Sequence, residues 1–225
     1  MNAPVTPMIS PADLLEKTAA ALAAADALLA VARERLAAKG KGDGRVSGTL
    51  VEQHQYGVHG FAWLATYVEA LRQMQDWAQR LSSEGALGET ERLILQIAFG
   101  EYLWQLYGGI PMNQGEIVRP QDMGLSQDDQ RVLMTPAVQW LTQHGNSDAA
   151  RLRLAELMAQ QEGVASFGAT GLEEEFEMVR EQFRRFTDDR VLPDAHGWHL
   201  RDDLFLMEIV DEMSELGVFG LSIPE

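Results

Sequence analysis

Apolar residues recur at helical spacing along almost the whole chain, and the pattern predicts an all-α fold. The first helix begins at Ser10-Pro11-Ala12-Asp13, which combines a capping serine, a proline at the first helical position and an acid in the first turn. It should end near Ala38. The stretch 40–48, in which four of nine residues are glycine, then favours a flexible linker. A phosphate-binding loop would need a different spacing and a preceding strand.

A second long helix is predicted over 49–82. Gly57 and Gly60 lie inside it, and each glycine costs a helix about 1 kcal/mol unless another backbone packs against it. We therefore expect another helix to pack closely there. The third helix, 88–107, is apolar almost all round, which is typical of a helix buried in the middle of a bundle. Further helices are predicted over 127–143 and 147–161, with Ser126 and Ser147 as caps.

Small residues are frequent over 163–171, and they indicate a domain boundary that we place near residue 168. The prediction is a helical extension, 1–168, followed by a second part, 169–225. The second part opens with a helix whose charged face lets Glu181 pair with Arg185. Its other face is one apolar stripe, made of Leu172, Phe176, Val179, Phe183 and Phe186.

After this helix the sequence predicts a polar, turn-like connection over 193–202 and then one more helix. That helix should bury Leu206, Val210 and Met213. Gly217 should stop it, because glycine readily adopts the left-handed conformation that ends a helix.

Composition narrows the possible functions. The chain has 225 residues, 46% of them apolar, and chains of this size bury roughly 70% of their unfolded surface. Its 34 acidic and 18 basic residues give a net charge of −16, which repels nucleic acid and anionic membranes. The absence of cysteine fits a reducing compartment, and neither a signal peptide nor a membrane span is visible. We expect a cytoplasmic protein.

Candidate chemistry is sparse. His196 and His199 lie close together, and with Asp194 and Asp202 they could bind a metal in a loop, although a polar connector explains the same residues. The sequence contains no paired Glu-x-x-His motifs for a di-iron bundle, no G-x-S-x-G elbow and no G-x-G-x-x-G dinucleotide fingerprint. No catalytic, cofactor-binding or metal-binding residue is therefore nominated.

The stretch from Leu172 to Glu225 has a more specific pattern. Val191-Leu192-Pro193 forms a turn between two helices, and the second helix ends in Leu216-Gly217-Val218-Phe219-Gly220-Leu221-Ser222-Ile223-Pro224-Glu225. This arrangement resembles the opening of an acyl-CoA dehydrogenase, whose second helix ends in L-G-x-x-G-(L/I)-x-x-P-E. Members of that family continue into a β-barrel middle domain and a helical carboxyl-terminal domain. The expected fold is a helical bundle followed by the first helices of the family's N-terminal domain, as an apparently truncated piece of a longer enzyme.

The resemblance implies oxidation of an acyl-CoA thioester to its 2,3-enoyl-CoA with FAD. In the family a glutamate removes the α-proton, hydride leaves the β-carbon for flavin N5, and the electrons pass to an electron-transfer flavoprotein. Members that act on methylsuccinyl-CoA form the extended branch to which the long helical region is compared. Since the base and most flavin contacts lie in the later domains, no residue role is carried over, and this chain alone is not expected to hold FAD.

Gln105-Leu106-Tyr107-Gly108-Gly109-Ile110-Pro111, with Val118-Arg119 and Asp122, also resembles a worn copy of a loop from the family's carboxyl-terminal domain. In the family that loop approaches the flavin of a neighbouring subunit. Pro111 and Met112 depart from its pattern, and the favoured interpretation is a helix end followed by a turn, which needs only Gly108-Gly109. A degenerate duplicate of the family's bundle and a plain helix end both remain open.

For residues 1–168 the sequence favours an interaction module that packs on the remainder of the dehydrogenase, or on a second subunit in a homo-oligomer. The alternative is a standalone all-α interaction module without catalytic activity. The two hypotheses differ in the last residues: a standalone module should fold Val218, Phe219, Leu221 and Ile223 onto its own core, whereas a piece of an enzyme should leave them exposed.

Overall fold

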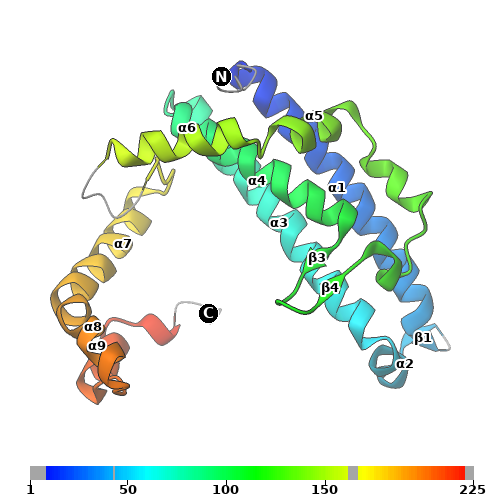
Figure 1. Ribbon diagram of the computed structural model, residues 1–225. Coiled ribbons are helices and arrows are strands. Elements are labelled where there is room, and N and C mark those ends of the chain that lie inside the picture. Colours follow the sequence, from blue (N-terminus) through cyan, green and yellow to red (C-terminus); the bar gives the residue numbers. More distant parts are fainter. Residues whose placement is uncertain (1–8, 43, 162–166, 221–225) are drawn as a thin grey trace. The chain divides into compact units, whose positions relative to one another are not determined.

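The computed structural model describes residues 9–42, 44–161 and 167–220, and the chain forms two compact units, Met1–Gly171 and Leu172–Glu225 (Figure 1). Both units are built almost entirely from helices, which confirms the predicted all-α class. The described strands are limited to two antiparallel hairpins of two-residue strands.

Unit 1, Met1–Gly171, contains the longest helices. Its described elements are, in chain order, α1 (Pro11–Gly40), β1 (Lys41–Gly42), β2 (Arg45–Val46), α2 (Gly48–Gln53), α3 (Gln55–Ser83), α4 (Glu89–Gly108), β3 (Ile110–Pro111), β4 (Ile117–Val118), the 3₁₀ turns η1 (Pro120–Met123) and η2 (Asp129–Leu133), α5 (Pro136–His144) and α6 (Asp148–Ala159).

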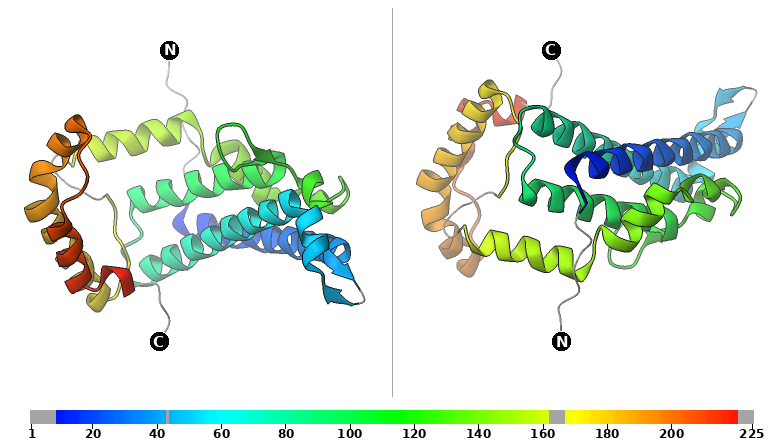
Figure 2. Two further views of the ribbon diagram at one scale, coloured as in Figure 1. Left: turned by 90° about the horizontal axis from the view of Figure 1, so that it is seen from below. Right: turned by 90° about the horizontal axis from the view of Figure 1, so that it is seen from above.

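Helices α1, α3 and α4 lie side by side and enclose the core of unit 1, with α5 against α1 and α4 (Figures 1 and 2). Large side chains from each helix are fully buried there, among them Leu28, Leu64, Leu71 and Phe99. Burying one such side chain contributes roughly 1.5–3 kcal/mol. The buried face of α1 itself consists mainly of leucines and alanines, and the small alanines allow the neighbouring helices to come close.

The local signals at the start of the first helix are confirmed. The Ser10 side chain caps α1 by accepting a hydrogen bond from the Asp13 amide at 3.1 Å, and Pro11 is the first helical residue. The glycine-rich stretch after α1 is not a simple loop, since Lys41 pairs with Val46 in the first hairpin.

The prediction of one helix over 49–82 is wrong, because the helix is interrupted at His54. This residue has φ −114° and ψ 20° and separates α2 from α3. Neither a proline nor a glycine marks this position, so the periodicity of apolar residues gave no sign of the break.

The predicted close approach at Gly57 and Gly60 is confirmed, but the partner is not a helix. A Cβ atom on Gly57 would lie 2.6 Å from the carbonyl oxygen of Asp122, and one on Gly60 would lie 2.2 Å from Cγ2 of Val118. Both partners belong to the β4–η1 segment. The glycines therefore leave room for the second hairpin and the turn after it to pack directly on α3.

The third predicted helix is α4, and it is buried on most sides but not all. Trp104 and Tyr107 are 51% and 38% exposed, so the prediction of burial all round is wrong on this face. The same side of α4 reaches α5: Nε1 of Trp104 donates to the carbonyl oxygen of Thr142 at 2.8 Å, and one turn earlier the backbone of α4 meets the end of α5. A Cβ atom on Gly100 would lie 2.6 Å from the amide nitrogen of Asn146, and one on Gly145 would lie 2.4 Å from the carbonyl oxygen of Gln96.

The helix predicted over 127–143 is two elements, η2 and α5. Pro136 is the first residue of α5, and Thr135 caps it by accepting from the Val138 amide at 3.2 Å. The residue before a proline is disfavoured in the helical conformation, so the chain breaks at Thr135. The next helix, α6, begins with the predicted Ser147 cap.

The helix end at Gly108-Gly109 is confirmed. Gly109 has φ +134°, and its amide donates to the carbonyl oxygen of Gln105 at 2.8 Å. The chain then forms the β3–β4 hairpin, which buries Ile110 and Val118.

Unit 2, Leu172–Glu225, is a chain of shorter helices. Its described elements are α7 (Glu174–Phe186), the π-helical turn η3 (Thr187–Val191), α8 (Leu192–Arg201), α9 (Met207–Glu215) and the 3₁₀ turn η4 (Val218–Gly220). The stretch 193–202, predicted as a turn, lies almost wholly in α8, because Pro193 falls in the first turn of that helix, where its missing amide hydrogen is not needed.

Replacing Gly60 by alanine is expected to lower the free energy of unfolding of unit 1 by about 1–3 kcal/mol, because the added methyl group overlaps Val118. Gly108→Ala is the matched control. A Cβ atom at Gly108 meets nothing within 4 Å, and the change should cost nothing or stabilise by up to about 1 kcal/mol. Urea unfolding followed by circular dichroism measures both variants. Equal stabilities for the two variants would contradict the close approach.

Candidate functional site

Unit 2 exposes a large share of its apolar side chains, and this surface is the candidate functional site. Among its described residues, Ile209 is the one apolar side chain that is fully buried. We use the term apolar face of unit 2 for its large apolar side chains that are exposed, on whichever element they lie. They are Leu172, Phe176, Met178, Val179, Leu192, Leu200, Leu204, Phe205, Leu206, Met207 and Phe219.

Helix α7 supplies the first part of this face. Four residues of the predicted apolar stripe lie on α7, whereas Leu172 precedes the helix, which begins at Glu174. Phe176 and Val179 of this stripe are 56% and 36% exposed. Glutamates in the first turn and arginines in the last turn favour the helix, because they complement its dipole. The predicted ion pair between Glu181 and Arg185 is confirmed at 3.5 Å.

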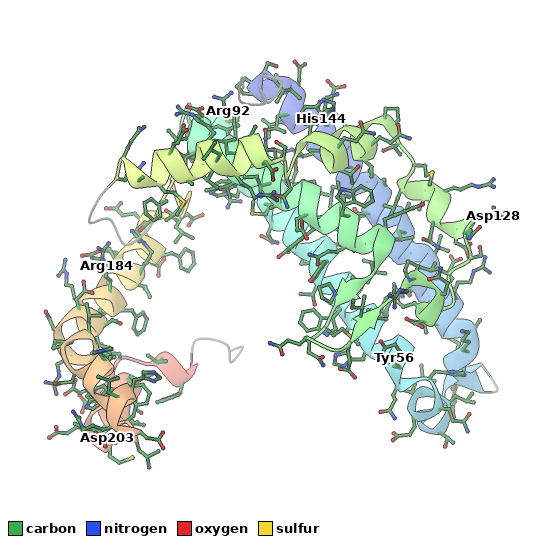
Figure 3. The ribbon with its side chains drawn as sticks, viewed as in Figure 1. Tyr56, Arg92, Asp128, His144, Arg184 and Asp203 are labelled. Atoms are coloured by element: carbon green, nitrogen blue, oxygen red, sulfur yellow. The ribbon has the colours of Figure 1, made fainter. Side chains whose placement is uncertain are left out.

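A π-helical turn joins α7 to α8 so that the two helices run on without a loop (Figure 3, where Arg184 marks α7). The Leu192 amide bonds to the carbonyl oxygen of Thr187, five residues earlier. Pro193 has no amide hydrogen to donate to the carbonyl four residues before it, and its ring would clash with that carbonyl. The wider π-helical turn avoids this clash. Arg190 of this turn makes a two-pronged ion pair with Glu212 on α9.

The segment between α8 and α9 supplies the second part of the face. Asp202 ends α8 with φ 57°, a left-handed conformation that aspartate tolerates better than most residues. Leu204, Phe205 and Met207 follow with 88%, 63% and 67% exposure. The prediction that Leu206 is buried is wrong, since it precedes α9 and is 53% exposed.

Val210 and Met213, the other two residues predicted to be buried on this helix, are only half-buried. Gly217 ends the α9 region with φ +76°, as predicted.

The arginines and the carboxylates of unit 2 differ in how many of them form ion pairs. Each arginine between residues 172 and 220 makes an ion pair within the unit, and the pairs are Arg180–Glu177, Arg184–Asp188, Arg185–Glu181, Arg190–Glu212 and Arg201–Asp203. Many carboxylates of the unit have no such partner, so the charge that it offers to other molecules is negative.

Comparison with known proteins identifies relatives of this unit and of the chain. Residues 173–225 match the model of the acyl-CoA dehydrogenase N-terminal domain. The chain is also 54% identical over 215 residues, 95% of its length, to (2S)-methylsuccinyl-CoA dehydrogenase from Cereibacter sphaeroides. The predicted resemblance to the acyl-CoA dehydrogenases is confirmed. The chain spans 38% of the length of that dehydrogenase.

The residues that were considered as metal ligands are placed differently from the loop that the sequence predicted. His196 and His199 lie on α8 and not in a loop, and Asp202 is the residue that caps this helix. In the described parts of the chain no three histidine or carboxylate side chains are grouped closely enough to hold a metal ion.

Unit 1 has two grooves whose lining can be compared with the needs of FAD, the cofactor of acyl-CoA dehydrogenases. One, of about 570 Å³, lies between α1 and α5 and presents Asp13 and Glu16 beside Lys17 and Trp140. The other, of about 240 Å³, presents Glu52 and Asp122 near His54. A dinucleotide pyrophosphate requires a set of hydrogen-bond donors, and carboxylates repel it. These grooves do not fit FAD.

Two further observations bear on the dehydrogenase-like chain as a whole. No helix within 9–42, 44–161 or 167–220 has the length and hydropathy needed to cross a bilayer. Of the final apolar residues that separate the two functional hypotheses, Phe219 is 57% exposed and Val218 is half-buried. Leu221 and Ile223 lie outside the described residues.

Acid is expected to lower the free energy of unfolding of unit 2, because it protonates Glu212 and breaks its ion pair with Arg190. The hydrogen bond from Arg190 lowers the pKa of Glu212 below its ordinary value. A carboxyl group with a lowered pKa in the folded state stabilises that state at neutral pH, and the stabilisation is lost as pH falls through the ordinary and then the lowered pKa. Thermal unfolding between pH 7 and pH 3 should therefore show a smaller acid loss for Glu212→Gln than for the unchanged protein.

Glu215→Gln is the matched control, because Glu215 lies on the same helix and makes no ion pair with any residue that the structure describes. An equal reduction of the acid loss in both variants would show that general charge repulsion, and not this pair, causes the effect.

Proposed function

We propose that this chain is part of an FAD-dependent acyl-CoA dehydrogenase that oxidises an acyl-CoA thioester to its 2,3-enoyl-CoA. Methylsuccinyl-CoA is the proposed substrate. The observation that carries the proposal is the 54% identity over 95% of the chain to a relative whose name states that activity. The match of residues 173–225 to the family's N-terminal domain supports the reaction class independently.

In this proposal the groups that act on the substrate come from the remainder of the enzyme. The chain corresponds to 38% of the relative's length, and the two grooves tested in unit 1 do not fit a flavin dinucleotide. FAD, when bound, accepts the electrons removed from the acyl chain, and an electron-transfer flavoprotein is the proposed next acceptor. The proposed location is the cytoplasm.

The apolar face of unit 2 is proposed to pack against the remainder of the same dehydrogenase. Helices α7 and α9 are amphipathic, yet the described part of the unit buries only one apolar side chain completely. Monomeric proteins rarely leave large contiguous apolar patches in water, because each square ångström of apolar surface removed from water contributes about 25 cal/mol. The relative is longer than this chain, and we propose that the region corresponding to its additional length covers the apolar face.

Unit 1 is proposed to be an interaction module that packs on the dehydrogenase or takes part in oligomerisation. Its own core is complete, and the residues available to a partner include Trp104 and Tyr107, whose rings meet edge to face at 6.4 Å on the exposed side of α4. Exposed aromatic pairs of this kind are enriched in protein interfaces.

The proposed activity is tested on the complete enzyme. Addition of (2S)-methylsuccinyl-CoA should bleach the flavin absorbance and yield the 2,3-enoyl-CoA, whereas a saturated acyl-CoA lacking the second carboxylate should react more slowly. An enzyme without residues 1–168 should keep flavin reduction but change its subunit number in light scattering. Absence of flavin reduction with any acyl-CoA overturns the proposed reaction, and loss of reduction with unchanged assembly overturns the role of unit 1.

Packing of the apolar face is tested with Phe176→Glu. In the present chain Phe176 is 56% exposed, and a change at such a site should alter the free energy of unfolding by no more than about 0.5 kcal/mol. In the complete enzyme the same change should cost about 1–3 kcal/mol, because the new carboxylate would be buried. Val46→Glu, at a position 74% exposed in unit 1, should be neutral in both. A neutral Phe176→Glu in the complete enzyme would contradict the proposed packing.

A further inference from the structure

Residues 167–171, the last residues of unit 1, lie against α3 and α4 and are held there through their backbone. The Ala169 carbonyl oxygen accepts a hydrogen bond from Nε1 of Trp77 on α3 at 3.0 Å. The Ala169 amide donates to Oε1 of Glu91 on α4 at 2.7 Å. Both backbone groups of one residue are therefore bound by side chains that come from two different helices.

Glu91 is set up for this contact by its position. It lies in the first turn of α4, near Arg92 in Figure 3, and is only 7% exposed. Gly88 makes room for the carboxylate, since a Cβ atom there would lie 2.7 Å from Oε2 of Glu91. A buried carboxylate requires hydrogen-bond donors, and the Ala169 amide is one. The start of the helix favours the negative charge as well.

Glycines on both sides of Ala169 fit the segment to the two helices. Gly168 and Gly171 have φ +83° and φ +63°, backbone angles that residues with a side chain rarely adopt. A Cβ atom on Gly168 would lie 3.1 Å from Oε1 of Glu91, and one on Gly171 would lie 3.2 Å from Cδ1 of Trp77. The helices thus receive a segment of small residues at close range.

We propose that Trp77 and Glu91 form a backbone clasp, a binding site on α3 and α4 for the chain's own segment 167–171. The clasp binds the amide and carbonyl groups of Ala169 and not its side chain. It fixes the point at which the chain leaves unit 1, immediately before Leu172. The identification of the following residues as the dehydrogenase part rests on the proposed function, but the clasp itself does not.

The clasp explains a feature that the helical core alone does not. The carboxylate of Glu91 is almost completely removed from water, and burial of an ionised group is costly unless hydrogen-bond donors replace its hydration. In the clasp, Glu91 and Trp77 are positioning residues that tie the end of unit 1 to its helices. The connection to unit 2 consequently starts from a fixed point of unit 1.

The test measures hydrogen exchange of the Ala169 amide in the whole chain by NMR. The amide should be protected, and Trp77→Phe, which keeps an aromatic ring but removes the donor, should raise its exchange rate. Glu91→Leu, which removes the acceptor, should do the same. For hydrogen bonds of this strength the expected increase is about tenfold or more.

Trp63→Phe is the matched control. Trp63 is half-buried on the same helix, and its Nε1 donates to Nε2 of His59 at 2.8 Å, not to the segment. Exchange of Ala169 should be unchanged in this variant. The clasp is overturned if the amide exchanges as fast as an unfolded peptide in the unchanged chain, or if Trp77→Phe has no greater effect than Trp63→Phe. If Glu91→Leu does not fold, Trp77→Phe decides alone.

The exchange measurement is independent of flavin and substrate, so failure of the clasp and failure of the proposed activity are separate results. Protected Ala169 in an enzyme that does not oxidise any acyl-CoA would leave the clasp intact and overturn the dehydrogenase assignment. Fast exchange of Ala169 in an active enzyme would do the reverse.

Discussion

Glycines on α3 and α4 and at the end of α5 allow neighbouring segments of unit 1 to approach the helix backbone closely. Gly57 and Gly60 accommodate the β4–η1 segment, and Gly100 and Gly145 bring α4 against the end of α5. A methyl group at any of these positions would overlap atoms of the neighbouring segment, so the arrangement of the helices depends on their absence.

Unit 2 obtains its order from different interactions. Fixing the backbone of one residue costs about 1–2 kcal/mol, whereas complete burial of one side chain such as Ile209 returns only roughly 1.5–3 kcal/mol. Helix dipoles and ion pairs such as Arg190–Glu212 add modest terms, because exposed pairs contribute little. The small buried core of unit 2 and its exposed apolar side chains are what the proposed packing on another segment would account for.

The sequence predicted features whose signals are local. Ser10 and Pro11 mark the start of α1 without reference to any other part of the chain, and Gly217 marks the end of α9 in the same way. The glycines of α3 indicated a close approach, but periodicity within one helix contains no information on its partner, and a hairpin segment took the place of the expected helix. Breaks such as that at His54, which no glycine or proline marks, depend on the tertiary arrangement.

The candidate site was predictable only where its signal is local in the sequence. The helical spacing of the apolar residues of α7 predicted its stripe. The four consecutive apolar residues 204–207 have no helical period, and Leu206 among them was predicted to be buried. Glu91 looked like an ordinary acid in the first turn of a helix. Its partner lies 78 residues later in the chain, and only the folded structure shows that the Ala169 amide reaches it.

The charge distribution of unit 2 bears on how its apolar face can be recognised. Its arginines are all engaged by its own carboxylates, so a partner meets an apolar surface among unpaired acids. Burial of the apolar side chains supplies most of the free energy of such contacts, whereas charges at the rim mainly select the partner and its orientation. A surface that covers this face therefore has to present apolar side chains at its centre and basic residues at its edge. An acidic covering surface would be opposed by repulsion even if its shape were complementary, because like charges brought together at an interface cost several kcal/mol.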